Sequence, residues 1–309
     1  MPRGSILLLE VISSELRAED FDSIRKFTNQ GRLQEQLIVF VKVFCANTVL
    51  PERTPPVLAD EYVSQTVLVR DGLLSSGLYK EKALDDFLLE LRGGGKWGYN
   101  LTAKAGLLRS IADRRHNDLI KFEVFVKSGP RKQRAARNSV LSVFDKYDSA
   151  MADAGVMDFS QLERKFSDGL GNGGYKTFSK TLQAILVDEY QDTNLLQEAI
   201  YFGLAKSSGA PLSVVGDDDQ SLYRFRGATV ELFSDFPKRL REKLRRNTKP
   251  VFLTRNYRST KQIVSFVGSY GGLDAKFQGV RVKGKPKIGA GPNAQEGTPV
   301  LFYVSRRSL

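Results

Sequence analysis

The spacing of apolar residues divides the chain into two parts with different periodicities. Up to about residue 155, apolar positions recur at intervals of three and four residues, which predicts amphipathic helices. The clearest of these segments are 33–44, 81–92 and 138–151. We therefore predict a mostly helical subdomain over residues 1–155 and interpret its leucine and aromatic stripes as core rather than as a binding site.

After residue 155, short apolar runs alternate with segments of helical periodicity. The runs expected to form strands are 183–188, 211–217 and 250–254. The helical segments that follow them are 194–206, 229–236 and 259–270. This alternation predicts an α/β fold, with a parallel sheet and helices packed on both faces. A last strand is predicted at 299–304.

Polar residues follow each of the three predicted strands. Asp188, Asp217 and Asn256 stand at or just after the strand ends. Ligands of open α/β sheets bind beyond the carboxyl ends of the strands. We therefore expect these three residues at one edge of the sheet.

The charge balance favours a polyanionic partner. The chain has 47 Lys and Arg against 35 Asp and Glu, a net charge of +12, which suits nucleic acid or an anionic membrane surface. The basic stretches 131–137 and 238–246 could contact phosphates, with solvated helix faces as the alternative. We find neither a secretory signal nor a run of about 20 apolar residues that could span a bilayer. We expect a cytoplasmic protein without a membrane partner.

Cysteine and histidine are too scarce for several kinds of site. The chain has one cysteine, Cys45, and one histidine, His116. An intrachain disulfide and a Cys/His metal cluster are therefore excluded. We interpret His116, which lies among charged neighbours, as a solvated surface residue.

The segment AILVDEYQDTN, residues 184–194, ends an apolar run in acidic residues. Asp188 and Glu189 are adjacent carboxylates, and their mutual repulsion is relieved when a cation lies between them and a ligand. One acid could hold Mg²⁺ together with phosphate oxygens, while the other takes a proton from an attacking water. The alternative is a helix start, with Asp192 as its cap.

The segment VVGDDDQSLYRFRGA, residues 214–228, follows the second predicted strand. Gly216 allows a sharp turn, and the Gln220 amide can donate to a phosphate and accept from a water. The next residues interleave rings with guanidinium groups, a pattern typical of single-stranded nucleic acid binding: Tyr223, Arg224, Phe225 and Arg226. The alternative is that these rings fill the core.

The segment LTRNYRST, residues 253–260, offers a ring beside a cation at a predicted strand-to-helix junction. Arg258 could stabilise charge on a transferring phosphoryl group, and Tyr257 could stack on a nucleobase.

In this order, the three segments resemble motifs II, III and IV of the UvrD/Rep family of superfamily-1 DNA helicases. The resemblance covers roughly residues 138–304. It implies a portion of a RecA-like motor domain at 156–249, preceded by an accessory-type helical subdomain and followed by the start of a second motor domain at 250–309. It also implies an ATP-dependent 3′-to-5′ helicase of repair or replication that moves on single-stranded or partly duplex DNA, with ATP and Mg²⁺ as cofactors.

The resemblance assigns roles to individual residues. It makes Asp188 the magnesium ligand, Glu189 the base acting on the lytic water and Arg258 the arginine finger. The residues it implies around the nucleotide are Gln191, Asp217, Gln220 and Tyr257, and those that face the DNA strand are Tyr223, Arg224, Phe225 and Arg226. The nuclease-linked branch of the family usually carries a lysine where this chain has Asp219, which favours the UvrD/Rep branch.

The family also needs a phosphate-binding loop, GxxxxGK[ST]. The one candidate is GLGNGGYKT at 169–177, and it fails because Tyr175 separates Gly174 from Lys176. We interpret it as a turn between helix and strand, and we expect the isolated chain to be inactive. Either a complementary helicase fragment supplies the loop, or the chain is an inactive nucleic-acid-binding remnant. The presence of Glu189, Gln220 and Arg258 favours the first hypothesis.

Overall fold

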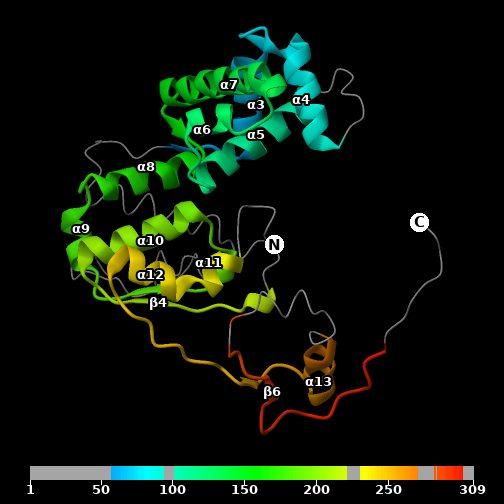
Figure 1. Ribbon diagram of the computed structural model, residues 1–309, viewed down its shortest axis with the longest axis vertical. Helices are drawn as coiled ribbons and strands as arrows, with labels where there is room; N and C mark the ends of the chain where they lie inside the picture. The colour runs from blue at the N-terminus through cyan, green and yellow to red at the C-terminus, as the bar shows by residue number, and fades with distance from the viewer. Residues whose placement is uncertain (1–56, 94–100, 221–229, 271–281, 283, 302–309) are drawn as a thin grey trace.

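The computed structural model describes residues 57–93, 101–220, 230–270, 282 and 284–301 (Figure 1). Among these residues, helices dominate, and strand pairing is confined to short parallel pairs. The pairs are β1 (Val57–Leu58) with β2 (Val156–Met157), β3 (Ile185–Val187) with β4 (Leu212–Val214), and β5 (Arg255–Asn256) with β6 (Gly289–Ala290). Within the described ranges, every helix is too short or too polar to cross a membrane.

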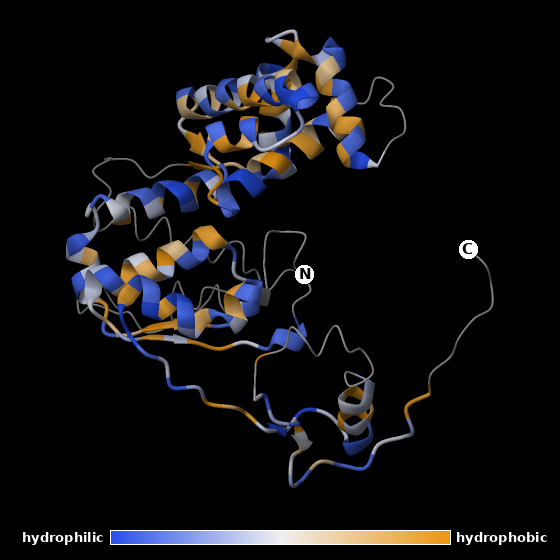
Figure 2. Ribbon diagram, in the orientation of Figure 1, coloured by the Kyte–Doolittle hydropathy of each residue, from blue (hydrophilic) through white to orange (hydrophobic). Residues whose placement is uncertain are grey.

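Helices build the first hydrophobic core. They are α3 (Glu61–Val67), the π-helix η1 (Leu68–Leu74), the 3-10 helix η2 (Leu78–Lys80), α4 (Lys82–Arg92), α5 (Leu101–Asn117), α6 (Phe122–Lys127), the 3-10 helix η3 (Arg131–Gln133) and α7 (Arg134–Asp153). Hydrophobic and hydrophilic residues alternate along the ribbons of these helices (Figure 2). Leu84 and Leu88 of α4 and Val140 of α7 are completely buried in this core. The helices predicted at 81–92 and 138–151 are thereby confirmed as core elements, while 33–44 lies outside the described residues.

A second core surrounds the predicted acidic segment. Its elements are α8 (Phe159–Gly171), α9 (Lys176–Thr181), β3, the 3-10 helix η4 (Tyr190–Asp192), α10 (Leu195–Ser208), β4, the 3-10 helix η5 (Asp218–Gln220), α11 (Val230–Ser234) and α12 (Phe236–Leu244). Tyr190 is fully buried at its centre and lies edge-on to Phe236, with ring centroids 5.1 Å apart. The residue between the acids and the glutamine of the segment is therefore a packing anchor.

The start of α10 is fixed by a capping box. The Asn194 side chain accepts from the Gln197 N–H at 2.9 Å, and the Gln197 side chain accepts from the Asn194 N–H. This pairing satisfies two of the free N–H groups at the helix start. The alternative that Asp192 caps this helix is therefore wrong, because the cap is two residues further on.

The β3–β4 pair confirms the strands predicted at 183–188 and 211–217, although both are shorter than expected. Along β3 the burial alternates, and Leu186 is 46% exposed. The continuous RecA-like sheet with helices on both faces is not confirmed within the described residues. The strand predicted at 250–254 is wrong: this segment finds no strand partner in the described chain, and Leu253 is 79% exposed.

The part from 250 to 301 has a different character from the two cores. It contains β5, β6 and α13 (Lys261–Tyr270), which confirms the helix predicted at 259–270. None of its described hydrophobic side chains belongs to the buried core. Polar contacts such as that between Lys261 Nζ and Glu296 Oε1, at 2.6 Å, connect its elements.

Helix α8 contacts both cores. On one side, Ser160 Oγ donates to Asp113 Oδ1 of α5 at 2.8 Å. On the other, Gln197 Nε2 of α10 donates to Glu163 Oε1 at 3.2 Å. The two cores are thus joined through polar side chains as well as through packing.

Glu163 makes this junction sensitive to pH. Burial raises the pKa of its carboxyl to about 7, and the nearby Asp113 and Asp158 carboxylates raise it as well. The hydrogen bond from Gln197 lowers the pKa, but by less than burial raises it. The folded state therefore keeps a proton that the unfolded state releases as pH rises above the usual value of 4.5. This contribution to stability is present at low pH and is lost as pH rises through 7. Glu163→Gln is expected to remove that loss and to make the variant more stable than the parent chain at pH 8.

Urea unfolding at pH 4.5, 6 and 8 measures this effect. The matched control is Glu242→Gln on the exposed side of α12, which should leave the pH dependence unchanged. Parallel pH profiles for the parent chain and Glu163→Gln would contradict the assignment.

Candidate nucleotide site

The acidic segment leaves β3 through a strained turn. Asp188 is exposed, and its Oδ1 accepts from the Glu189 N–H at 2.9 Å. Glu189 has φ +50°, a left-handed conformation that costs a residue with a side chain roughly 1–2 kcal/mol. The next residue holds the turn in place, because the Tyr190 N–H donates to Val215 O at 2.9 Å. Such strain is concentrated at functional sites, which makes this turn the first candidate.

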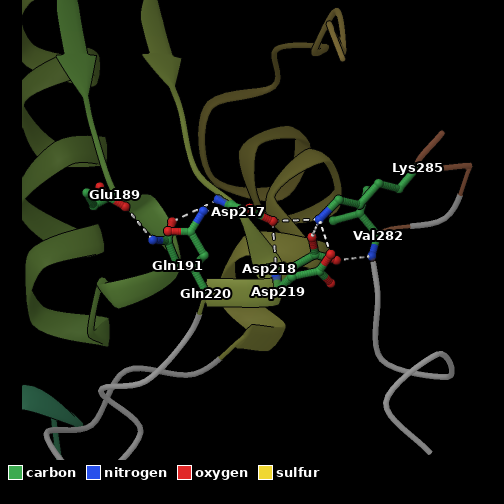
Figure 3. A network of polar contacts seen from close by, with 8 residues as sticks. All are labelled: Glu189, Gln191, Asp217, Asp218, Asp219, Gln220, Val282 and Lys285. Carbon is green, nitrogen blue, oxygen red and sulfur yellow. Dashed lines mark hydrogen bonds and ion pairs between the residues drawn. The ribbon is translucent and has the colours of Figure 1, made fainter. Parts of the chain in front are cut away.

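Gln191 joins the ends of the two paired strands. Its side chain is 1% exposed. Its Nε2 donates to Glu189 Oε2 at 2.6 Å, and its Oε1 accepts from the Asp217 N–H at 3.0 Å. Figure 3 shows this path from Glu189 to the acidic turn after β4. The prediction that the ends of these two strands lie together is confirmed.

Gly216 is required by the approach of Gln191. A Cβ at this position would lie 2.5 Å from Gln191 Oε1 and 3.0 Å from a ring carbon of Phe233. The glycine does not have a positive φ. The sharp turn expected from the sequence is therefore not the reason for glycine here; the reason is the space that the buried amide occupies.

The turn after β4 gathers three carboxylates. Asp217 accepts from Gln220 Nε2 at 2.7 Å through one oxygen and from the Asp219 N–H at 3.1 Å through the other. Lys285 Nζ lies 2.6 Å from Asp217 and 2.9 Å from Asp219, and it also contacts Asp218. Burial alone would raise the pKa of Asp217, but hydrogen bonds from Lys285 and Gln220 outweigh it and hold the pKa below its usual value.

Two acidic groups are candidate places for Mg²⁺. The Asp217, Asp218 and Asp219 oxygens converge within 4.8 Å, but the Lys285 ammonium already lies against all three. Asp188 is exposed and uses only Oδ1 within the described residues. A cation that keeps waters and phosphate oxygens as ligands needs only one such carboxylate. Asp188 therefore fits magnesium better than the triplet does.

Asp192, the third acid of the segment, is half-buried. Burial, reinforced by the neighbouring Glu189, raises the pKa of its carboxyl to about 6. Its Oδ1 is buried without a hydrogen-bond partner within the described chain.

The residues predicted from the third segment are not joined to this network. Asn256 Oδ1 accepts from the N–H groups of Arg258 and Ser259, at 2.9 and 2.8 Å, which forms a turn before α13. The Tyr257 ring is 79% exposed, and the Arg258 side chain is also exposed. In the described ranges, no hydrogen bond or ion pair links Arg258 to Glu189 or Gln220. Asn256 belongs to β5 of another sheet, so its expected place beside Asp188 and Asp217 is not found.

The predicted DNA-facing residues, Tyr223, Arg224, Phe225 and Arg226, lie outside the described residues. Their role stays a prediction.

The glycine-rich segment is a turn that contains a packed tyrosine. It runs from the last residues of α8 to the first of α9, so it connects two helices rather than a helix and a strand as expected. Tyr175 is 4% exposed and packs on Phe166, with ring centroids 4.8 Å apart. The residue that breaks the phosphate-loop spacing is thus a core residue, which agrees with a structural turn.

Both basic stretches contain arginines with structural roles. Arg137 Nη1 donates to Phe125 O at 2.7 Å. Arg246 Nη1 donates to Ala210 O at 2.6 Å and so satisfies a carbonyl just beyond α10. The exposed basic residues of the two stretches remain candidates for phosphate contacts: Arg131, Lys132, Arg134, Lys238, Arg241, Lys243 and Arg245.

His116 is half-buried, so the expectation of a solvated surface histidine is wrong. Burial lowers its pKa to about 4, and the positive charge of Arg115 reinforces the shift. Arg115 Nη2 donates to His116 Nε2 at 2.9 Å, which requires a neutral imidazole. The ring lines a pocket of about 490 Å³ beside the glycine-rich turn.

Comparison with known proteins places these features in context. Residues 32–241 match the UvrD/REP helicase N-terminal domain. The chain is 36% identical over 139 residues to the ATP-dependent DNA helicase UvrD1 of Mycobacterium tuberculosis, which covers 42% of this chain and 17% of that protein. It is 36% identical over 129 residues to DNA helicase II of Escherichia coli, covering 40% of this chain and 16% of the relative.

A nuclease-linked relative matches at a similar level. One subunit of the ATP-dependent helicase/nuclease of Clostridium novyi is 37% identical over 135 residues, covering 41% of this chain and 11% of that protein. Asp219 alone therefore does not separate the two branches. In each case, the matched region spans less than a fifth of the relative's length.

Proposed function

The chain belongs to the UvrD/REP helicase family, and on that premise we propose that it forms part of an ATP-dependent 3′-to-5′ DNA translocase of repair or replication. The observation that carries this proposal is the hydrogen-bonded path from Glu189 through the buried Gln191 side chain to Asp217 and Gln220. A binding module has no need of an acid held on a strained turn and tied to the end of the neighbouring strand. A nucleotide hydrolase needs an acid held in position to take the proton of the attacking water.

We assign the chemistry to a small set of residues. Asp188 would hold Mg²⁺, which would neutralise charge on the phosphate oxygens. Glu189 accepts the proton of the attacking water. Gln191 orients Glu189. Gln220 and Asp217 lie at the end of β4, where they respond to the state of the bound phosphates. Tyr257 and Arg258 have no hydrogen bond or ion pair to this network among the described residues, and we propose that they approach the nucleotide from the second motor domain, as adenine-stacking ring and arginine finger, when it is bound.

The two hydrophobic cores support a division close to the expected one. One core draws its buried residues from 59–151 and the other from 170–240. We propose that the first belongs to an accessory-type helical subdomain, and the second to a RecA-like motor domain over 156–249. Residues 250–309 then begin a second motor domain.

We further propose that a complementary helicase segment supplies the phosphate-binding loop. The sequence has no GxxxxGK[ST], and parallel sheets normally have both faces covered. Leu186 of β3 and Val215 just after β4 are 46% and 55% exposed, and Val251 is 75% exposed. These apolar surfaces support a missing neighbour of the same fold.

Complementation tests this proposal. The purified chain alone is expected to hydrolyse ATP negligibly. Mixed with a helicase fragment that carries the phosphate-binding loop and the family motifs that come after motif IV, it should give hydrolysis stimulated by single-stranded DNA. Robust hydrolysis by the chain alone would contradict the need for a complement. Continued DNA binding without hydrolysis in the mixture would instead identify a nucleic-acid-binding remnant.

DNA binding is tested at the predicted stacking rings. Replacing both Tyr223 and Phe225 with alanine is expected to lower affinity for a single-stranded oligonucleotide by at least about tenfold, since a stacked base contributes ~1–3 kcal/mol. Fluorescence anisotropy measures the affinity. Tyr62→Ala is the matched control, because this ring on α3 is 78% exposed. Unchanged affinity combined with lost thermal stability would show that the rings belong to the core.

A further inference from the structure

The acidic turn after β4 depends on a cation from far along the chain. Asp217, Asp218 and Asp219 hold their oxygens within 4.8 Å, and Asp218 is 5% exposed. Three carboxylates this close repel one another strongly away from bulk water. The Lys285 ammonium contacts all three and is itself largely buried, with a side chain 12% exposed. Its positive charge offsets the repulsion among the three carboxylates and so stabilises this turn.

The same segment makes a second contact with the turn. The Val282 N–H donates to Asp218 Oδ2 at 2.6 Å (Figure 3). Asp218 therefore binds a side chain and a backbone group from one short stretch 64 to 67 residues away. An isolated surface lysine forms only a weak ion pair. The Lys285 ammonium is largely buried and is accompanied by the Val282 backbone hydrogen bond, so together they form a contact that docks this segment on the acidic turn.

The segment that docks here has few anchors of its own. In residues 250–301, none of the described hydrophobic side chains lies in either core. This part nevertheless carries Tyr257 and Arg258. Among the described residues, the contacts that connect it to the acidic turn are polar and come from Lys285 and Val282.

The contact continues into the candidate catalytic acid. Lys285 binds Asp217 Oδ1, the Asp217 N–H donates to Gln191 Oε1, and Gln191 Nε2 donates to Glu189 Oε2. Each link is a hydrogen bond of 3.0 Å or less. A displacement of Lys285 would therefore move Asp217. Two hydrogen bonds, both made by Gln191, connect Asp217 to the Glu189 carboxylate.

We propose that Lys285 is a positioning residue that docks the Arg258-bearing segment onto the acidic turn and, through Asp217 and Gln191, holds Glu189 in place. The docking itself is independent of any nucleotide. The effect on Glu189 rests on the function proposed above.

The test uses the full chain with Cys45→Ser and a pair of spin labels. One label is attached at Glu242→Cys on α12 and the other at Ser269→Cys on α13, both exposed positions. Double electron–electron resonance should give a narrow distance distribution for the parent chain and a broad one for Lys285→Met. Lys285→Arg should retain the narrow distribution. Lys287→Met, an exposed lysine two residues away, is the control for the loss of one charge.

Hydrogen exchange supplies the readout for positioning. Peptides that contain the Asp217 amide are expected to exchange at least tenfold faster in Lys285→Met, while peptides from α7 in the other core stay unchanged. Faster exchange everywhere would mean general destabilisation and would overturn the positioning role. If Lys285→Met does not fold, Asp218→Asn removes the opposite end of the contact and should broaden the label distances in the same way.

Two outcomes overturn the proposal: unchanged distances and exchange in Lys285→Met, or the same changes in Lys287→Met. None of these measurements involves ATP. A failure of the proposed hydrolase function therefore leaves the docking result standing. A functional complemented hydrolase with unchanged Lys285→Met distances overturns the docking alone.

Discussion

Replacing Glu189 with glutamine is expected to lower DNA-stimulated ATP hydrolysis of the complemented protein by about 10²–10⁴-fold, the usual contribution of a positioned general base. The carboxylate is half-buried and receives a hydrogen bond from Gln191 Nε2 at 2.6 Å. A glutamine in its place keeps the size of the side chain but cannot take the proton of the water. Nucleotide affinity and DNA affinity should therefore change little.

Steady-state hydrolysis and nucleotide binding, measured on the same complemented sample, separate these effects. Glu242→Gln on α12 is the control for a change of one negative charge at an exposed position. A hydrolysis rate within a few-fold of the parent for Glu189→Gln would remove this residue from the chemistry. Loss of nucleotide affinity in parallel with the rate would indicate a ligand rather than a base.

Replacing Arg239 with methionine is expected to lower the free energy of unfolding by about 3 kcal/mol, at the low end for breaking a buried ion pair. Arg239 Nε lies 2.7 and 2.9 Å from the two Glu198 oxygens, and Glu198 is 2% exposed. The Tyr190 hydroxyl also donates to Glu198, at 3.0 Å. Without the guanidinium, the buried carboxylate keeps, among the described residues, the neutral Tyr190 hydroxyl as its side-chain donor.

Urea unfolding of single and double variants measures this pair. The double variant Arg239→Met with Glu198→Gln should recover part of the loss, because the uncompensated charge is removed. Arg241→Met, on the exposed side of the same helix, should change stability by less than about 0.5 kcal/mol. Additive effects of the two single variants would show that the ion pair contributes no coupling.

The sequence allowed the local part of the site to be predicted. An apolar run followed by acids locates the end of a strand, and the parallel pairing of β3 with β4 brings Asp188 and Asp217 to the same edge. The cap of α10 was also within reach, because Asn194 and Gln197 have the spacing of a capping box. The acidic composition of the segment suggests Asp192 as the cap, but the capping-box spacing identifies Asn194.

The remaining features depend on contacts between distant residues. Lys285 lies in a Gly- and Lys-rich stretch with no periodic pattern, and its partners are 66 to 68 residues away. Gly216 is explained only by a side chain that arrives from the neighbouring strand end. The run at 250–254 has the composition of a strand, but composition does not supply the partner that a strand needs.

Helix α8 has a consequence for cooperativity. One side of it is bound to α5 and the other to α10, so both cores share its surface. If either core unfolded completely, α8 would lose its contacts on that side, and the other core, which also packs on α8, would be destabilised. The two are therefore expected to melt as one unit, in a single transition that reports on the whole body rather than on either half.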